Sequence, residues 1–321
     1  MSSVIKLHEW LPIIRKEYLQ DFISQGGSAV KFVIPTNGAE TRQLDTEFQQ
    51  IAGEEGFSYA LIDATYAPIH KIEHLFFAVA RQIDWDALAL EYVRRLLSGK
   101  YELPTSKLDF NLEKIAELNG RDAREMNPLV HQLLTQHLYR NYEMTQEFRI
   151  AMLRLCQHQL DPESVSAELC DAIKSWLKGE KMPISALKPA LIFQKIGRHN
   201  ARHMLFSLAQ WLRQTGANGL IIMLDIVRYL QEKRPTEPDG TYFYSNAAVL
   251  DCYEVLRQFI DGTDESKYLM MLVIAPPQFL DPDNLKRGLN AYDALKLRIW
   301  DEVYDQLHAN PLSSLVRVAA N

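Results

Sequence analysis

Cysteine is scarce in this chain, with three residues among 321 and none of them in a CxxC pair. An odd, widely spaced set gives no disulfide framework, so Cys156, Cys170 and Cys252 are expected to be reduced core residues. No apolar run approaches the roughly 20 residues that a membrane-spanning helix requires. The opening stretch MSSVIKLHEW is too charged for the apolar core of a signal peptide. These absences predict a cytoplasmic protein without membrane contact.

An excess of positive charge is also lacking. The chain has 35 Lys and Arg against 41 Asp and Glu, which gives a formal net charge of −6. This balance excludes nucleic-acid binding through bulk charge, although a local basic face stays possible. The Gly-x-Ser-x-Gly elbow of many hydrolases is missing, and no cysteine stands in a context typical of a nucleophile.

What is present is an alternation of buried strands and helices. Residues 8–25 have helical periodicity, and the run SAVKFVIP predicts a strand that ends at Pro35. A helix and a second strand, FSYALIDAT, follow. The runs GLIIMLD and YLMMLVIAPP predict two further buried strands, and residues 284–308 are expected to be helical. Strand, helix and strand in succession indicate a parallel α/β sheet.

A long helical segment interrupts this sheet. Residues 69–215 carry successive apolar stripes at helical spacing, separated by prolines, and exceed any plain strand–helix–strand crossover. We therefore expect three parts: the first strands of a P-loop-like core in residues 1–68, a helical insertion in 69–215, and the rest of the core in 216–321.

The first strand and turn have the topology of a P-loop but not its residues. A P-loop needs glycines, a lysine and a Ser or Thr that holds Mg²⁺. With Pro35 at the first glycine, Glu40 falls at the last glycine, Thr41 at the lysine and Arg42 at the hydroxyl position. Asn37 and Gly38 lie between Pro35 and Glu40. Of the residues in this turn, only Gly38 has the backbone flexibility of a P-loop glycine. An acidic side chain in this loop would repel a triphosphate.

The strand LIIMLD resembles a Walker B element, in which Asp225 would coordinate Mg²⁺. The next position often carries the acidic residue that activates water, and here it is Ile226. The alternative role for Asp225 is to cap a turn at the end of its strand. The sequence alone leaves both roles open.

Several stretches together resemble the P-loop-type ATP-binding proteins of BREX-like phage-defence operons, in the subgroup close to BrxD. They are GGSAVKFVI, IEHLFFAVARQIDW, NARHMLFSLAQWLRQTGANGLIIMLD, YEVLRQFIDGTDE, LVIAPPQFLD and RGLNAYDALKLRIWDEV. The resemblance implies an AAA-type core within a multi-protein, DNA-associated defence assembly. It places Asp225 at the Walker B aspartate, and Arg287 and Arg298 where such proteins carry sensor-like arginines.

Two constellations offer alternatives. His70, Glu73 and His74 have the H-x-x-E-H spacing of inverted zinc proteases, which would require both His on one helix face and a third ligand. The stretch RHNARH is either a solvated basic helix face or an anion contact. Its candidate residues are Arg198, His199, Arg202 and His203.

Three functions follow from these observations. The first is a non-hydrolysing, ATPase-like subunit that assembles with other proteins of its operon. It would reach DNA indirectly or through a local basic face, and would need no cofactor beyond a weak ATP/Mg ligand. The second is an active ATPase with an unusual loop, and the third is a zinc hydrolase built on His70, Glu73 and His74.

Overall fold

The computed structural model describes residues 4–107, 109–231, 240–300 and 309–319, with the side chains of residues 38–40 excepted. Within the chain two compact units can be distinguished. The first contains Met1–Val79 and Ala217–Asn321, and the second contains Ala80–Gly216. The first unit therefore holds residues from both halves of the sequence.

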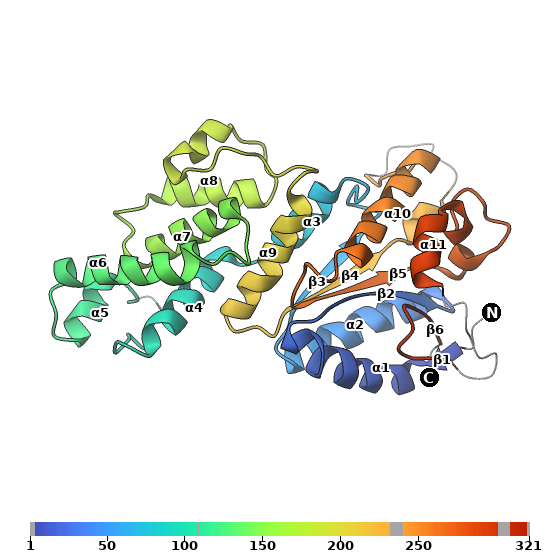
Figure 1. Ribbon diagram of the computed structural model, residues 1–321, viewed down its shortest axis with the longest axis horizontal. Helices are drawn as coiled ribbons and strands as arrows, with labels where there is room; N and C mark the ends of the chain where they lie inside the picture. Colours follow the sequence, from blue (N-terminus) through green and yellow to red (C-terminus); the bar gives the residue numbers. More distant parts are fainter. Residues whose placement is uncertain (1–3, 108, 232–239, 301–308, 320–321) are drawn as a thin grey trace. The chain divides into compact units, whose positions relative to one another are not determined.

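The first unit is built on a six-stranded sheet in which every pair of neighbouring strands is parallel. The strand order is β1-β6-β2-β5-β4-β3 (Figure 1). The bounds are β1 (Val4–Lys6), β2 (Ser28–Pro35), β3 (Ser58–Asp63), β4 (Leu220–Asp225), β5 (Leu269–Ile274) and β6 (Leu315–Ala319). This parallel sheet confirms the expected α/β fold of the P-loop NTPase type.

Helices cover both faces of the sheet. On one face lie α1 (Leu7–Ile13), the π-helical segment η1 (Ile14–Gln20) and α2 (Gly38–Glu54) (Figure 1). Trp10, Phe48 and Val33 belong to the buried cluster on this side. On the other face α10 (Asn246–Asp261) contacts β2. The central strands β4 and β5 are apolar along their length because both of their faces are buried.

Two strands were not expected from the sequence. β1 and β6 pair with each other, and β6 also pairs with β2. Buried Lys31 in β2 helps to hold the chain that leads into β6, because its Nζ donates to the carbonyls of Leu312 at 3.0 Å and Ser313 at 2.6 Å. A buried ammonium group is tolerated where acceptors of this kind surround it.

The helix expected over residues 284–308 is found in part of that range. The structure has the short 3₁₀ helix η7 (Leu289–Ala291) and then α11 (Asp293–Ile299), while residues 301–308 lie outside the described part of the chain. The expected helix over 8–25 is divided into α1, η1 and the 3₁₀ turn η2 (Ile23–Gln25). Between β4 and α10 lies the 3₁₀ helix η5 (Val227–Leu230), and η6 (Pro277–Leu280) follows β5.

The second unit is helical, as its apolar periodicity predicts. Asp84 and Ser166 cap the N-termini of α4 and α8 through their side chains, which is typical of these residue types. Tyr92 and Trp211 bring α4 and α9 together with ring centroids 4.6 Å apart. The elements are α4 (Trp85–Ser98), α5 (Leu112–Leu118), α6 (Ala123–Leu134), η3 (Thr135–Tyr139), α7 (Gln146–Leu160), α8 (Ala167–Leu177), η4 (Ile184–Ala190) and α9 (Ala201–Gln214).

The segment that joins β3 to this unit contains α3 (Ile72–Ala80). α3 is strongly apolar, and Leu75, Phe76 and Val79 are buried. Over the described residues, no helix combines the length and the apolar character that crossing a membrane would require.

Candidate nucleotide site

The connection between β2 and α2 is short. β2 ends at Pro35 and α2 begins at Gly38, so Thr36 and Asn37 alone join them. The Thr36 N–H donates to the carbonyl of Val318 in β6 at 3.0 Å. A phosphate-binding loop instead presents several consecutive N–H groups to the ligand. This connection offers few such donors, and one of them is already bound to a neighbouring strand.

The residues at the other P-loop positions lie on α2. Thr41 is half-buried and Arg42 is exposed, both in the early part of the helix. The side chain of Glu40 lies outside the described part of the structure, so the predicted repulsion between this carboxylate and a triphosphate stays a prediction.

Asp225 occupies the carboxyl end of β4, as expected, and its side chain caps the turn that follows. Its Oδ1 accepts a hydrogen bond from the Val227 N–H at 2.8 Å. The strand register places Asp63, at the end of β3, directly beside Asp225. Asp63 caps its own turn in the same way, since its Oδ1 accepts from the Thr65 N–H at 2.7 Å. Two carboxylates therefore meet at one edge of the sheet.

Burial and charge act together on this pair. The pKa of Asp225 is raised to about 6. Desolvation is the main cause; the Val227 hydrogen bond acts in the opposite direction, and the neighbouring charge of Asp63 also raises it. Asp63 was not singled out in the sequence, although FSYALIDAT ends in an aspartate just as LIIMLD does. Finding it would have required knowing that these two strands are neighbours.

Ile226 offers no proton acceptor to this edge. Its side chain is buried, and its N–H donates to the carbonyl of Ile274 in β5 at 2.9 Å. The side chain at position 226 therefore lies in the core, and it directly follows Asp225 in the sequence.

Arg287 is buried and tied to backbone carbonyls. Its Nη1 donates to Tyr229 O at 2.9 Å and its Nη2 to Tyr244 O at 2.7 Å, while the guanidinium lies 5.5 Å from the ring centroid of Phe243. Tyr229 belongs to η5, which directly follows Asp225 and Ile226. Arg287 thus supports the backbone that follows the carboxylate pair, and two of its donors are taken by the protein.

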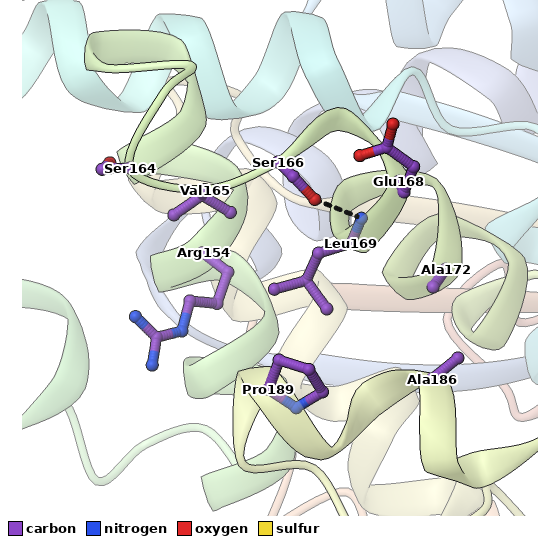
Figure 2. A pocket seen from close by; sticks show the side chains of 9 residues that line it. All are labelled: Arg154, Ser164, Val165, Ser166, Glu168, Leu169, Ala172, Ala186 and Pro189. Carbon is purple, nitrogen blue, oxygen red and sulfur yellow. Dashed lines mark hydrogen bonds between the residues drawn. The ribbon is translucent and has the colours of Figure 1, made fainter.

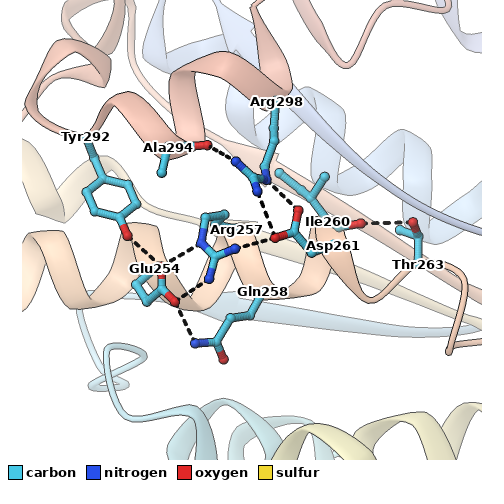
Figure 3. A network of polar contacts seen from close by, with 9 residues as sticks. All are labelled: Glu254, Arg257, Gln258, Ile260, Asp261, Thr263, Tyr292, Ala294 and Arg298. Carbon is cyan, nitrogen blue, oxygen red and sulfur yellow. Dashed lines mark hydrogen bonds and ion pairs between the residues drawn. The ribbon is translucent and has the colours of Figure 1, made fainter.

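Arg298 takes part in a surface network between α10 and α11 (Figure 3). Its guanidinium binds the carboxylate of Asp261, with Nη2 3.0 Å from Oδ2, and Arg257 binds the same carboxylate. Glu254 accepts from Arg257 and from the hydroxyl of Tyr292. The hydrogen bond from Arg257 is the main cause that lowers the pKa of Glu254 to about 2. In this structure Arg298 joins two helices.

The proposed zinc ligands do not share a helix face. His70 lies in the turn before α3 begins at Ile72, and its ring meets that of Tyr244 edge-on with centroids 5.6 Å apart. Desolvation is the main cause that lowers the pKa of His70. Among the residues that the structure describes, no group of three or more His, Cys, Asp or Glu could hold a metal ion. In the described residues His70, Glu73 and His74 are therefore not arranged as the alternative zinc site would require.

The four residues of the predicted anion contact lie in the second unit, around the beginning of α9. Arg198 and His199 are in the preceding turn and are exposed, so the two histidines do not share a helix face. Arg202 and His203 are on the helix, and both contact the ring of Phe206, at 6.0 and 5.9 Å.

The family of this chain follows from a match to a protein-family model. The model described as BREX system ATP-binding protein BrxC/D matches residues 107–320, which is more than half of the chain. The chain belongs to this family. Comparison with curated proteins and with solved structures gave no match. The matched residues include β4 with Asp225 and both arginines, whereas β2, α2 and Asp63 precede them. The expected resemblance is thereby confirmed, and the chain is a member of the family described as BREX system ATP-binding protein BrxC/D.

Proposed function

We propose that this chain is an ATPase-like BREX subunit that does not hydrolyse ATP and acts by assembling with other proteins. The observation that carries the proposal is the two-residue connection between β2 and α2, whose Thr36 N–H is bound to Val318 O. A triphosphate needs several aligned N–H donors and a lysine; this connection adds few donors to those of the first turn of α2, and it has no lysine. Ile226 supports the same conclusion, since it replaces the residue that would activate water.

Titration calorimetry with ATP and Mg²⁺, together with a phosphate-release assay, tests this proposal. We expect a dissociation constant weaker than about 1 mM and no turnover. Tight binding combined with turnover that disappears in Asp225→Ala would contradict it. Asp281→Ala, which removes an exposed carboxylate that begins a turn after β5, is the matched control.

The second candidate function is an active ATPase in which another protein completes the site. The carboxylates of Asp63 and Asp225 favour it, because they lie side by side at the carboxyl edge of the sheet and carboxylate oxygens are preferred Mg²⁺ ligands. ATP turnover that appears only after products of neighbouring genes are added, and is lost in Asp225→Ala, would establish this function.

The assembly role implies partners encoded in the same operon, and an association with DNA either through them or through a basic face of this chain. Affinity purification of the full chain from cells that express the neighbouring genes tests the first part. Recovery of none of their products would contradict it.

A further inference from the structure

One stretch, most of which lies in the second unit, is entirely without acidic residues. Between Glu180 and Asp225 the sequence has no Asp or Glu, although the whole chain has a net charge of −6. The positively charged or titratable residues of this stretch are Lys181, Lys188, Lys195, Arg198, Arg202, Arg213, His199 and His203. The positive charge is therefore concentrated locally, as expected for a surface that attracts an anionic partner.

Most of these cations face solvent without a counter-charge. Lys181, Lys188, Lys195 and Arg198 are exposed, and none of their side chains forms an ion pair or hydrogen bond within the part of the chain that the structure describes. Elsewhere in the same unit some exposed cations are paired, as Lys114 is with Glu117 at 2.7 Å, whereas others, such as Lys100, form no ion pair among the described residues. These four side chains therefore keep a positive charge that no ion pair within the described residues offsets.

Residues 191–200, between η4 and α9, lack regular secondary structure, but their backbone is held in place. Ile192 and Ile196 are buried and anchor it. The indole of Trp176 donates to Gln194 O at 3.1 Å, and the Asn200 amide donates to Lys195 O at 3.3 Å. A surface held in this way loses little conformational entropy when it binds a ligand.

Large apolar side chains stand among the cations. Phe193 is 63% exposed and Leu191 is 57% exposed, and Leu191 adopts a left-handed backbone conformation with φ of 64°. An exposed aromatic ring beside lysine and arginine is the combination by which proteins stack on the bases of single strands while neutralising phosphates.

A cavity adjoins the same stretch. It measures about 610 Å³, which suits a small aromatic ligand, and its walls include Leu191, Phe193, Gln194, Tyr139 and Arg154. The remaining lining residues combine hydroxyl, amide and carboxylate groups with two apolar side chains: Thr135, Gln146, Glu147, Ile150 and Leu153.

Arg154 connects this cavity with a second one of about 470 Å³, which it lines beside Val165 and Pro189 (Figure 2). Its Nη1 donates to Gln157 at 3.0 Å, whereas its buried Nε has no hydrogen-bond partner. A guanidinium without a carboxylate partner among the described residues would be satisfied by an acceptor on a ligand.

We propose that this face of the second unit binds single-stranded nucleic acid. Lys188, Lys195 and Arg198 neutralise phosphates, Phe193 stacks on a base, and the cavity beside Arg154 receives another base. This inference rests on the DNA association proposed above and supplies a surface for it. It does not involve the carboxylate edge of the first unit, so a negative result with ATP leaves it unaffected.

Fluorescence anisotropy of the full chain with a labelled oligothymidine of about 20 nucleotides tests the proposal, with a salt titration for each variant. Replacing Lys188, Lys195 and Arg198 together by Gln should weaken binding at least tenfold. It should also lower the slope of log affinity against log salt by about 2, since each phosphate contact on a single strand contributes about 0.7. Phe193→Ala should weaken binding about tenfold and leave the slope unchanged.

The control is the same change of charge at three exposed lysines outside the stretch, Lys16, Lys100 and Lys107, which should leave affinity nearly unchanged. All substituted residues are exposed, and circular dichroism verifies that each variant is folded. Absence of oligonucleotide binding at low salt, or equal losses in both triple variants, would overturn the proposal. Tighter binding to a duplex would also overturn it, as would equal binding to polyglutamate that is insensitive to Phe193→Ala, which would indicate an acidic protein partner.

Discussion

A carboxylate at the end of a buried strand can serve chemistry or structure, and Asp225 illustrates the difference. Its Oδ1 is already occupied by the Val227 N–H, and Asp63 lies beside it on the neighbouring strand. The backbone of the turn provides the hydrogen bond, and the strand register places Asp63 beside Asp225. The pKa of Asp225 is raised because it costs free energy to ionise this carboxyl group in a desolvated position next to a like charge.

This cost predicts a pH dependence of stability. Because the folded-state pKa of about 6 exceeds the ordinary value of 3.8, the folded protein holds a proton that the unfolded chain has lost between these pH values. The Asp225 contribution to the free energy of unfolding should therefore fall by about 2–3 kcal/mol as pH rises from about 4 to about 6. Asp225→Asn, which keeps the oxygen acceptor, should remove this dependence and stabilise the protein at neutral pH.

Urea unfolding at several pH values measures the effect. Asp281→Asn is the control, because that exposed carboxylate caps a similar turn through the Asp283 N–H. A variant Asp225→Asn that is less stable than the parent chain at neutral pH would contradict the prediction.

Arg287 is expected to stabilise the fold through its hydrogen bonds to two buried carbonyl groups. Arg287→Met would leave the carbonyls of Tyr229 and Tyr244 buried without their donors. We expect a loss of about 2–4 kcal/mol in the free energy of unfolding, measured by urea denaturation. Arg287→Lys should recover only part of the loss, because an ammonium group does not reproduce the two-pronged geometry of the guanidinium. Equal stability of Arg287→Met and the parent chain would show that these hydrogen bonds contribute nothing net.

At the scale of elements, α11 is attached to α10 largely through side chains. The helix has seven residues, and Arg298 and Tyr292 bind Asp261 and Glu254 of α10. A helix this short is marginal without such tertiary contacts. Besides the buried side chains of Leu295 and Ile299, the helix is therefore held by charged groups that are partly open to solvent.

Arg298→Gln should accordingly loosen α11 without unfolding the protein. We expect a global loss of only about 0.5–1 kcal/mol, because partly exposed ion pairs contribute little, but a clear acceleration of amide exchange confined to residues 293–299. Hydrogen exchange followed by mass spectrometry measures this. Arg42→Gln, at an exposed arginine on α2, is the control. Uniform acceleration across the first unit, or none in α11, would contradict the expectation.

The elements also show which parts of the fold can be predicted from sequence. β2, β4 and β5 are apolar runs with clear ends, such as Gly26-Gly27 before β2 and Asp225 after β4, and each was predicted. β6 was missed because its short run includes Arg317, and its place depends on pairing with β2. The neighbours of Asp225 likewise follow from strand order, which no local pattern encodes.

At the scale of the whole molecule, the helical unit interrupts the sheet between β3 and β4. Its core includes the Tyr92–Trp211 contact and the edge-to-face pair of Trp85 and Phe148, with centroids 6.2 Å apart. Both pairs lie entirely within residues 80–216. A unit with a core of its own is expected to fold without the rest of the chain.

Residues 80–216 produced alone should therefore give the circular dichroism of a helical protein and a cooperative thermal transition. Trp211→Ala in this fragment should lower the stability by about 3–5 kcal/mol, or prevent folding, because it creates a large cavity. Gln210→Ala, on the same helix, removes a half-buried side chain and should have a smaller effect. A fragment without a cooperative transition would show that the unit depends on the sheet.

The strand order also has a consequence for synthesis. β2 lies between β5 and β6, and both of these strands are encoded far downstream of it. While the chain is being made, β2 and β3 emerge with their hydrogen-bonding edges open and wait until the entire helical unit has been translated. Only then do β4 and β5 arrive to fill the gap between them. A nascent chain that stalls before β4 therefore exposes β2 and β3 without their partner strands, a state prone to aggregation that chaperones would have to shield.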